Sequence, residues 1–206
     1  MAKKSLYSLH PIFGMEAGYE RALLAKTGRD LAGWVELVKK DGPAGEKERR
    51  AWLRETHKLS TNYTWWIAER AEGRGGADTY DPERYVADLF AKKPALVPMY
   101  DRLLKLALKL GRDVKACPCQ TIVPLYRSRV FAQLKPATRT RLELSFVLGG
   151  MPFTERLRDS GGTAKGDRLT HVVALHALEE IDAEVGAWLT AAYERDAEPA
   201  RKAKRA

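Results

Sequence analysis

The stretch that most constrains this chain runs from residue 139 to residue 148, where apolar and polar residues alternate. In an extended strand one side would carry Thr140, Leu142, Leu144, Phe146 and Leu148, and the other Arg139, Arg141, Glu143 and Ser145. A period of two predicts a half-buried β-strand with its apolar side inward and its charged side in solvent. Neighbouring extended runs joined by short turns predict an antiparallel meander, with strands near residues 114–117, 121–126, 130–135, 140–148 and 171–176.

The residues before this stretch have helical periodicity instead. Apolar stripes predict helices over residues 15–26, 30–40, 44–57, 61–72, 81–91 and 94–110, with a last helix over 177–195. Asp30 is expected to cap the second of these helices. We therefore predict an α+β protein, in which a small all-helical N-terminal bundle precedes an antiparallel sheet packed against helices.

The domain boundaries are expected where proline and glycine interrupt the pattern. Residues 1–14 are predicted to be an N-terminal arm, because His10-Pro11 disfavours regular structure. The helical domain then covers 15–73 and the α+β domain 79–196, with the sequence GRGGAD between them as a linker. Residues 197–206 are predicted to form a basic tail.

Composition narrows the class of protein. Of the 206 residues 45% are hydrophobic, and five are Trp, so a core can be buried. No apolar run is long enough to span a membrane, and no apolar core follows the N-terminal lysines, so we expect neither a membrane partner nor a signal peptide. Two cysteines in a chain of this length indicate a reducing cytoplasm rather than a disulfide scaffold. No cofactor is predicted, and the oligomeric state is left open.

The net charge of +9 is unevenly distributed along the chain. Residues 111–170 carry 11 basic and five acidic residues, whereas residues 171–199 carry one basic and seven acidic residues. A basic segment attracts polyanions such as nucleic acid, although it is also an ordinary way to keep a surface soluble.

Two helices joined by a short turn, around residues 57–61, have the outline of a helix-turn-helix. As a nucleic-acid reader, the second helix would present Asn62, Tyr63, Trp66 and Arg70. The alternative is that the aromatic residues fill the core of the bundle, and helical spacing of aromatic residues favours this alternative.

The outward side of the predicted sheet is the second candidate surface. Tyr126 and the basic residues Arg127, Arg129, Arg139 and Arg141 are expected there, with Lys165, Arg168 and His171 nearby and with Lys135, Arg156 and Arg158 at its border. These residues predict a non-enzymatic nucleic-acid-binding protein, with a pocket for a small anionic ligand lined by Tyr126, Arg127, Arg139 and His171 as the first alternative. The loop near Lys165 lacks the Gly-Lys-Ser/Thr of a P-loop, which excludes that type of nucleotide site.

Cys117 and Cys119 give the second alternative, a redox or metal-binding protein. Two residues apart on a strand, both thiols would point to one side. A structural zinc site needs about four ligands, and neither a second cysteine pair nor a histidine at finger spacing is present. Buried reduced thiols are therefore favoured. His171 lacks an evident orienting carboxylate, so we expect a structural rather than a catalytic histidine.

Two long strings resemble known families. TGRDLAGWVELVKKDGP, followed by EKERRAWLRETHKLSTNYTWWIAER, resembles an N-terminal helical domain of unknown function found in bacteria. CPCQTIVPLYRSRVFAQLKPATRTRLELSF, with the later PFTERL, SGG and LTH, resembles a second domain of unknown function that often follows the first. The resemblance implies that relatives of the second domain occur beside nuclease-like modules, which favours nucleic acid as the ligand. The resemblance implies no catalytic residue, and LHALEEID departs from the helix start usual in that family.

Overall fold

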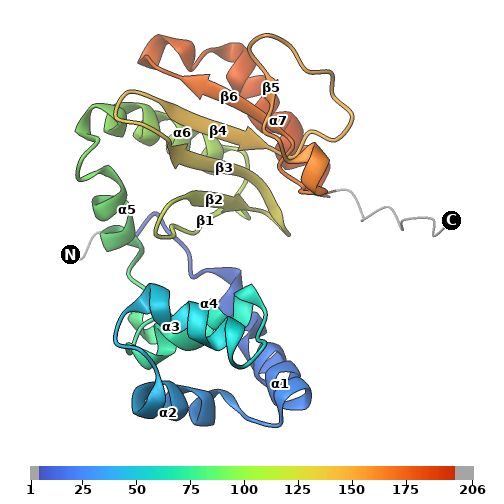
Figure 1. The fold of residues 1–206 in the computed structure, drawn as a ribbon. Coiled ribbons are helices and arrows are strands. Elements are labelled where there is room, and N and C mark those ends of the chain that lie inside the picture. The colour runs from blue at the N-terminus through green and yellow to red at the C-terminus, as the bar shows by residue number, and fades with distance from the viewer. Residues whose placement is uncertain (1–4, 198–206) are drawn as a thin grey trace, which may run out of the picture. The chain divides into compact units, whose positions relative to one another are not determined.

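The computed structural model describes residues 5–197, and within them the chain folds into two compact units (Figure 1). One unit is Leu9–Asp81, and the other combines the residues up to Ser8 with those from Pro82 onward. The predicted class, a helical N-terminal bundle followed by an antiparallel sheet with helices, is confirmed. Of the predicted basic tail, only Ala197 lies among the described residues, as the last residue of a helix.

The helical unit contains four α-helices and two short 3₁₀ helices. They are η1 (Pro11–Met15), α1 (Glu16–Thr27), α2 (Leu31–Asp41), α3 (Glu46–Glu55), α4 (Thr61–Ala71) and η2 (Ala77–Thr79). The predicted cap is confirmed, because the Asp30 carboxylate accepts a hydrogen bond of 2.8 Å from the Gly33 N–H. The core of this unit is formed by Leu23, Trp34, Val38, Leu53, Leu59 and Ile67.

The glycine-rich segment 73–78 belongs to this unit instead of forming a free linker. The Arg74 guanidinium forms ion pairs with Glu46, at 2.9 Å, and with Glu72. The next residues form η2, and the Gly76 N–H donates a hydrogen bond to the Thr79 hydroxyl. The ion pairs of Arg74 and the hydrogen-bonded turn of η2 together order a segment whose glycine content predicts flexibility.

The α+β unit contains one six-stranded sheet with the strand order β1-β2-β3-β4-β6-β5. Every neighbouring pair is antiparallel, and the strands are β1 (Lys115–Ala116), β2 (Val123–Tyr126), β3 (Val130–Pro136), β4 (Leu142–Phe146), β5 (Arg158–Asp159) and β6 (His171–Leu175). The helical elements are α5 (Pro82–Phe90), η3 (Pro94–Leu96), α6 (Val97–Lys109), η4 (Thr163–Lys165), η5 (Leu178–Glu180) and α7 (Ala183–Ala197).

Helices α6 and α7 lie against the same face of this sheet (Figure 1). On β4 the buried residues are Leu142, Leu144 and Phe146, whereas Glu143 and Ser145 are half-buried on the other face. β6 shows the same alternation, with Val173 and Leu175 inward. The alternation of residues 142–146 is confirmed, and the sheet has one apolar face and one polar face.

A β-bulge interrupts the alternation on β3. The pairing with β2 moves from Leu125 opposite Ala132 to Tyr126 opposite Val130, which leaves Phe131 as an extra residue. Phe131 is fully buried, and its ring meets the edge of Tyr193 of α7 at 5.8 Å between centroids. The bulge therefore sends Phe131 into the core and returns Val130 to the polar face.

Three features of this unit differ from the prediction. The expected loop after residue 148 contains β5 and η4, which have no apolar alternation to reveal them. The last helix begins at Ala183, because η5 occupies the residues before it. The predicted arm is tied to the protein: the Ser8 N–H donates to the Ala116 carbonyl at 2.9 Å, and the Tyr7 and Tyr100 hydroxyls are 3.0 Å apart.

Substitutions at adjacent positions of β4 test the two-faced sheet. Leu144→Ala is expected to lower the free energy of unfolding by about 2–5 kcal/mol, because it leaves a cavity in the core. Ser145→Ala, one residue further along the same strand, is expected to change it by less than about 0.5 kcal/mol. Urea denaturation followed by circular dichroism measures both, and equal losses for the two variants would contradict the assignment of faces.

Candidate functional site

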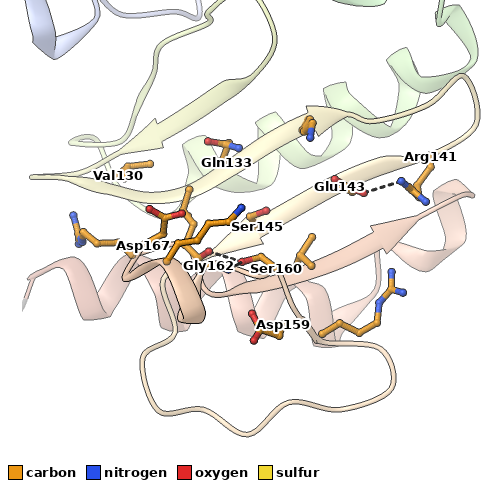
Figure 2. A pocket seen from close by; sticks show the side chains of 15 residues that line it. Val130, Gln133, Arg141, Glu143, Ser145, Asp159, Ser160, Gly162 and Asp167 are labelled. Atoms are coloured by element: carbon orange, nitrogen blue, oxygen red, sulfur yellow. Dashed lines mark hydrogen bonds and ion pairs between the residues drawn. The ribbon is translucent and has the colours of Figure 1, made fainter. Parts of the chain in front are cut away.

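The polar face of the sheet carries an open groove with a volume of about 770 Å³ (Figure 2). Its floor comes from β3, β4 and β6, and its wall comes from β5 and the following loop. The lining includes five basic residues, Lys135, Arg141, Arg158, Lys165 and Arg168, and three acidic residues, Glu143, Asp159 and Asp167. The groove is therefore charged and net positive.

Strand register explains the floor of the groove. Gln133 of β3 lies opposite Ser145 of β4, and Ser145 lies opposite Val172 of β6. Two residues further along β3, the next pair of side chains on the polar face is Lys135 opposite Glu143 of β4. Because the middle strand presents a serine here, the surface is low in the centre and offers hydroxyl and amide groups to a ligand.

Hydrogen bonds inside the loop shape the wall. The Ser160 hydroxyl donates to the Leu169 carbonyl at 2.6 Å, and the Asp167 N–H donates to the Gly162 carbonyl at 2.9 Å. Gly162 is required at its position, because a Cβ atom there would lie 2.5 Å from the Leu169 oxygen. The wall is thus a folded segment with its own bonding pattern.

A buried carboxylate anchors this loop to the rest of the unit. The Asp196 side chain of α7 is fully buried and accepts hydrogen bonds from the main-chain N–H groups of Ser128 and Arg129, at 2.9 and 2.7 Å. The guanidinium groups of Arg129 and Arg168 also contact it, at 3.3 and 3.1 Å. Asp196 therefore holds the β2–β3 turn and the wall loop against α7, and two of the predicted basic residues share its single negative charge.

Two more predicted arginines have partners within the protein. Arg127 contacts Asp113 at 2.7 Å and lies over the ring of Tyr193, whose hydroxyl also donates to Asp113. The hydrogen bond from Tyr193 and then that from Arg127 lower the pKa of the Asp113 carboxyl. Arg141 contacts Glu143 at 3.0 Å.

Three basic residues of the lining have no ion-pair partner in the part of the chain that the structure describes: Lys135, Arg158 and Lys165. All three are exposed to solvent. A fourth donor is the Arg141 Nε, which is buried and has no hydrogen-bond partner among the described atoms. The charge and donor capacity of the three exposed side chains are available to a ligand, whereas the Arg141 Nε is itself buried.

The other residues predicted for the sheet surface lie outside the groove lining. Arg139 is an exposed residue of the β3–β4 turn, and Tyr126 is half-buried at the end of β2. Burial raises the pKa of Tyr126 to about 12. His171 is fully buried on the apolar face of β6, where its ring nitrogens contact the Thr170 hydroxyl and the Met151 carbonyl, both at 2.9 Å. Of the residues predicted for this surface, the groove brings together Arg141, Lys165 and Arg168, and also Lys135 and Arg158 from its predicted border.

The predicted residues of the helical unit are spread over different environments. On α4, Tyr63 and Trp66 are half-buried, and the rings of both meet Tyr19 edge to face. Arg70 forms an ion pair with Glu16, and Asn62 is exposed. The exposed aromatic residue of this helix is instead Trp65. The Arg50 guanidinium carbon lies over one face of its ring, 3.6 Å from the ring centroid.

The two cysteines are not disulfide-bonded. Cys117 is fully buried just after β1, and burial raises the pKa of its thiol to about 12. Cys119 is half-buried, and its thiol lies 3.5 Å from the Cys117 carbonyl. Within residues 5–197 no group of three or more His, Cys, Asp or Glu side chains is arranged to hold a metal ion.

Sequence reasoning missed three central residues of the groove: Gln133, Ser145 and Asp167. The period-two alternation places Gln133 and Ser145 on the solvent-facing side of the sheet. It does not distinguish them as binding residues, because uncharged polar residues are common on such a face. Asp167 belongs to a loop whose fold depends on internal hydrogen bonds, which leave no periodic trace in the sequence.

The state of Cys117 gives a prediction about reactivity. With a pKa near 12, the thiolate fraction at pH 8 is on the order of one in ten thousand, so Cys117 should resist a disulfide reagent in the folded protein. The rate should also show no inflection near the ordinary thiol pKa. The measurement uses a Cys119→Ser variant, which leaves one cysteine, with and without denaturant; equal rates in both conditions would contradict it.

Comparison with known protein families supports the division of the chain into two modules. Residues 17–73 match the model of a family described as Domain of unknown function (DUF4287). Residues 86–196 match the model of a second family, described as Domain of unknown function (DUF5655). No curated protein and no solved structure matches significantly, and no helix among the described residues is both long and apolar enough to cross a bilayer. Because the second match covers more than half of the chain, the protein belongs to the DUF5655 family and carries a DUF4287 match before that domain.

Proposed function

We propose that the α+β unit is a non-enzymatic binding module that holds an anionic ligand in the groove on the polar face of its sheet. The observation that carries this proposal is the convergence of Lys135, Arg158 and Lys165 on one groove without ion-pair partners among the described residues. Three uncompensated cations on a concave surface raise the local concentration of anions and supply charge-assisted hydrogen bonds.

The basic residues near the groove differ in whether they contact an acidic side chain, and this difference supports the proposal. Arg127, Arg129 and Arg168 contact Asp113 or Asp196, so much of their charge stabilises the fold. The cations without such partners lie where the floor also offers the Ser145 hydroxyl and the Gln133 amide. Solubility requires only charge on the surface. It does not require lysines, an arginine, a hydroxyl and an amide to line the same groove.

Binding is a better account of this groove than catalysis. The described lining residues include neither a histidine nor a cysteine, and the buried His171 already uses both ring nitrogens. The groove volume falls within the range of about 300–1,000 Å³ typical of small-ligand sites. A cytoplasmic location remains a prediction from the sequence, because two cysteines in a chain of this length indicate a reducing compartment.

Nucleic acid is the second candidate ligand, favoured by the net charge of +9 and by cations on both the floor and the wall of an open groove. No aromatic residue is among the described lining residues, so a strand would contact the groove through its phosphates and not through stacked bases. Helix α4 adds less support, because Arg70 is paired with Glu16 and Trp66 packs against Tyr19.

The proposal is tested by calorimetric titration with pyrophosphate at low ionic strength. The Lys135→Ala/Lys165→Ala variant is expected to bind about tenfold more weakly or worse, because two charge-assisted contacts are lost. The matched control is Lys105→Ala/Lys109→Ala, which removes the same charge from exposed positions of α6 and should bind like the wild type.

Absence of binding to the wild type, or equal weakening in both double variants, would contradict a specific anion site. A single-stranded DNA oligonucleotide in the same titration tests the second candidate. If nucleic acid is the ligand, its affinity should fall steeply with added salt and should depend on the same two lysines.

A further inference from the structure

We propose that the ligand of this groove is a sugar phosphate, with its phosphate on the unpaired cations and its hydroxyl groups on Asp167 and the Ser145 hydroxyl. This inference rests on the proposed function and specifies the chemistry of the ligand. A site for a bare anion would gain nothing from carboxylates, yet three line this groove. The bonding of those three acids decides what else the ligand must contain.

Two of the three acids have partners inside the protein. Glu143 contacts the Arg141 guanidinium at 3.0 Å. Asp159 accepts from the Gly161 N–H at 2.7 Å and lies 3.4 Å from the Thr163 hydroxyl, so it helps to fold the wall loop. Neither acid needs a ligand to account for its presence.

Asp167 is different. Its main-chain N–H bonds to the Gly162 carbonyl, but its carboxylate has no hydrogen bond or ion pair to any of the described residues. A carboxylate is an acceptor only, and beside a bound phosphate it is repulsive unless a ligand donor lies between them. Hydroxyl groups on the carbon skeleton that bears the phosphate are such donors.

The arrangement of the lining fits a ligand of this kind. Figure 2 shows Asp167 toward the Val130 end of the groove and the Arg141–Glu143 pair at the opposite end. Between them lie Gln133 and Ser145, whose amide and hydroxyl groups can both donate and accept (Figure 2). Ser160 lies there too, but its hydroxyl already donates to the Leu169 carbonyl. A polyhydroxy compound can use this mixed centre, whereas an inorganic anion can use only its donors.

The base of a nucleotide is not expected to contribute. The described lining residues include no aromatic ring, and the apolar ones are confined to Val130, Leu169 and Val172. Recognition should therefore extend over the phosphate and the sugar alone. Free sugar phosphates and the ribose phosphate units of RNA share this chemistry, and the experiment separates these two sources.

The test compares dissociation constants for inorganic phosphate, ribose 5-phosphate and adenosine 5′-phosphate by calorimetry on the full chain. Ribose 5-phosphate should bind about tenfold more tightly than phosphate, because hydrogen bonds to a charged acceptor are added. Adenosine 5′-phosphate should bind within about threefold of ribose 5-phosphate, since no ring stacks on the base.

The Asp167→Ala variant should abolish the preference for ribose 5-phosphate without weakening inorganic phosphate, because it removes an acceptor and a repulsive charge together. Glu194→Ala, which removes an exposed acid of α7 outside the lining, is the matched control and should retain the preference. Thermal melting of both variants establishes that they are folded, as expected for exposed side chains without described partners.

The outcomes separate the two proposals. If phosphate binds but ribose 5-phosphate is no tighter, or if Asp167→Ala keeps the preference, the sugar phosphate inference is overturned while the anion site stands. If neither ligand binds, both fail. Once the preference for ribose 5-phosphate is established, the same titration is made with an oligouridylate and an oligodeoxythymidylate. Tighter, salt-sensitive binding of the oligouridylate alone identifies RNA as the source of the ligand. No gain in affinity over ribose 5-phosphate identifies a free sugar phosphate.

Discussion

One-sided burial of the antiparallel sheet is the constraint on which the α+β unit depends. Leu142, Leu144 and Phe146 of β4 are fully buried, and each contributes about 1.5–3 kcal/mol through the hydrophobic effect. Helices α6 and α7 both cover this face (Figure 1), and the opposite face carries the groove and its wall loop. A one-residue change in register would place these apolar side chains in water. The polar face is thus a direct consequence of the core, and the groove lies on it.

Charge pairing then decides which basic residues remain available on that face. Asp196 is a buried carboxylate with two main-chain N–H donors and two guanidinium groups around it. Only the carboxylate is fully buried, and both guanidinium groups are partly exposed, so the main-chain donors and the arginines together compensate the buried charge. Arginines that contact Asp196 are therefore primarily structural, whereas Lys135, Arg158 and Lys165 supply the positive potential of the groove.

The sequence predicts the sheet well and the site only in part. Period-two alternation identifies β4 and its outward residues, because hydrophobic burial is a local signal that repeats along the strand. It does not reveal the bulge that moves Phe131 inward, nor the two-residue strand β5, since neither depends on a repeating pattern. His171 illustrates the difficulty for site residues: its position beside basic loops indicates a surface role, whereas its strand phase places it in the core. Likewise, which arginines are compensated depends on Asp113 and Asp196, which are distant in the sequence from the residues they contact.

A phosphate-bearing ligand is expected to bind on the polar face of the sheet, and not on α4 or at the β3–β4 turn. The most direct measurement is a map of amide chemical shifts in nitrogen-15-labelled protein during titration with ribose 5-phosphate. Saturable shifts are expected to concentrate at the groove, around Ser145, Ser160, Gly162 and Lys165. Shifts that instead concentrate on α4, or around the β3–β4 turn at Arg139, would contradict it, as would a spectrum that does not change.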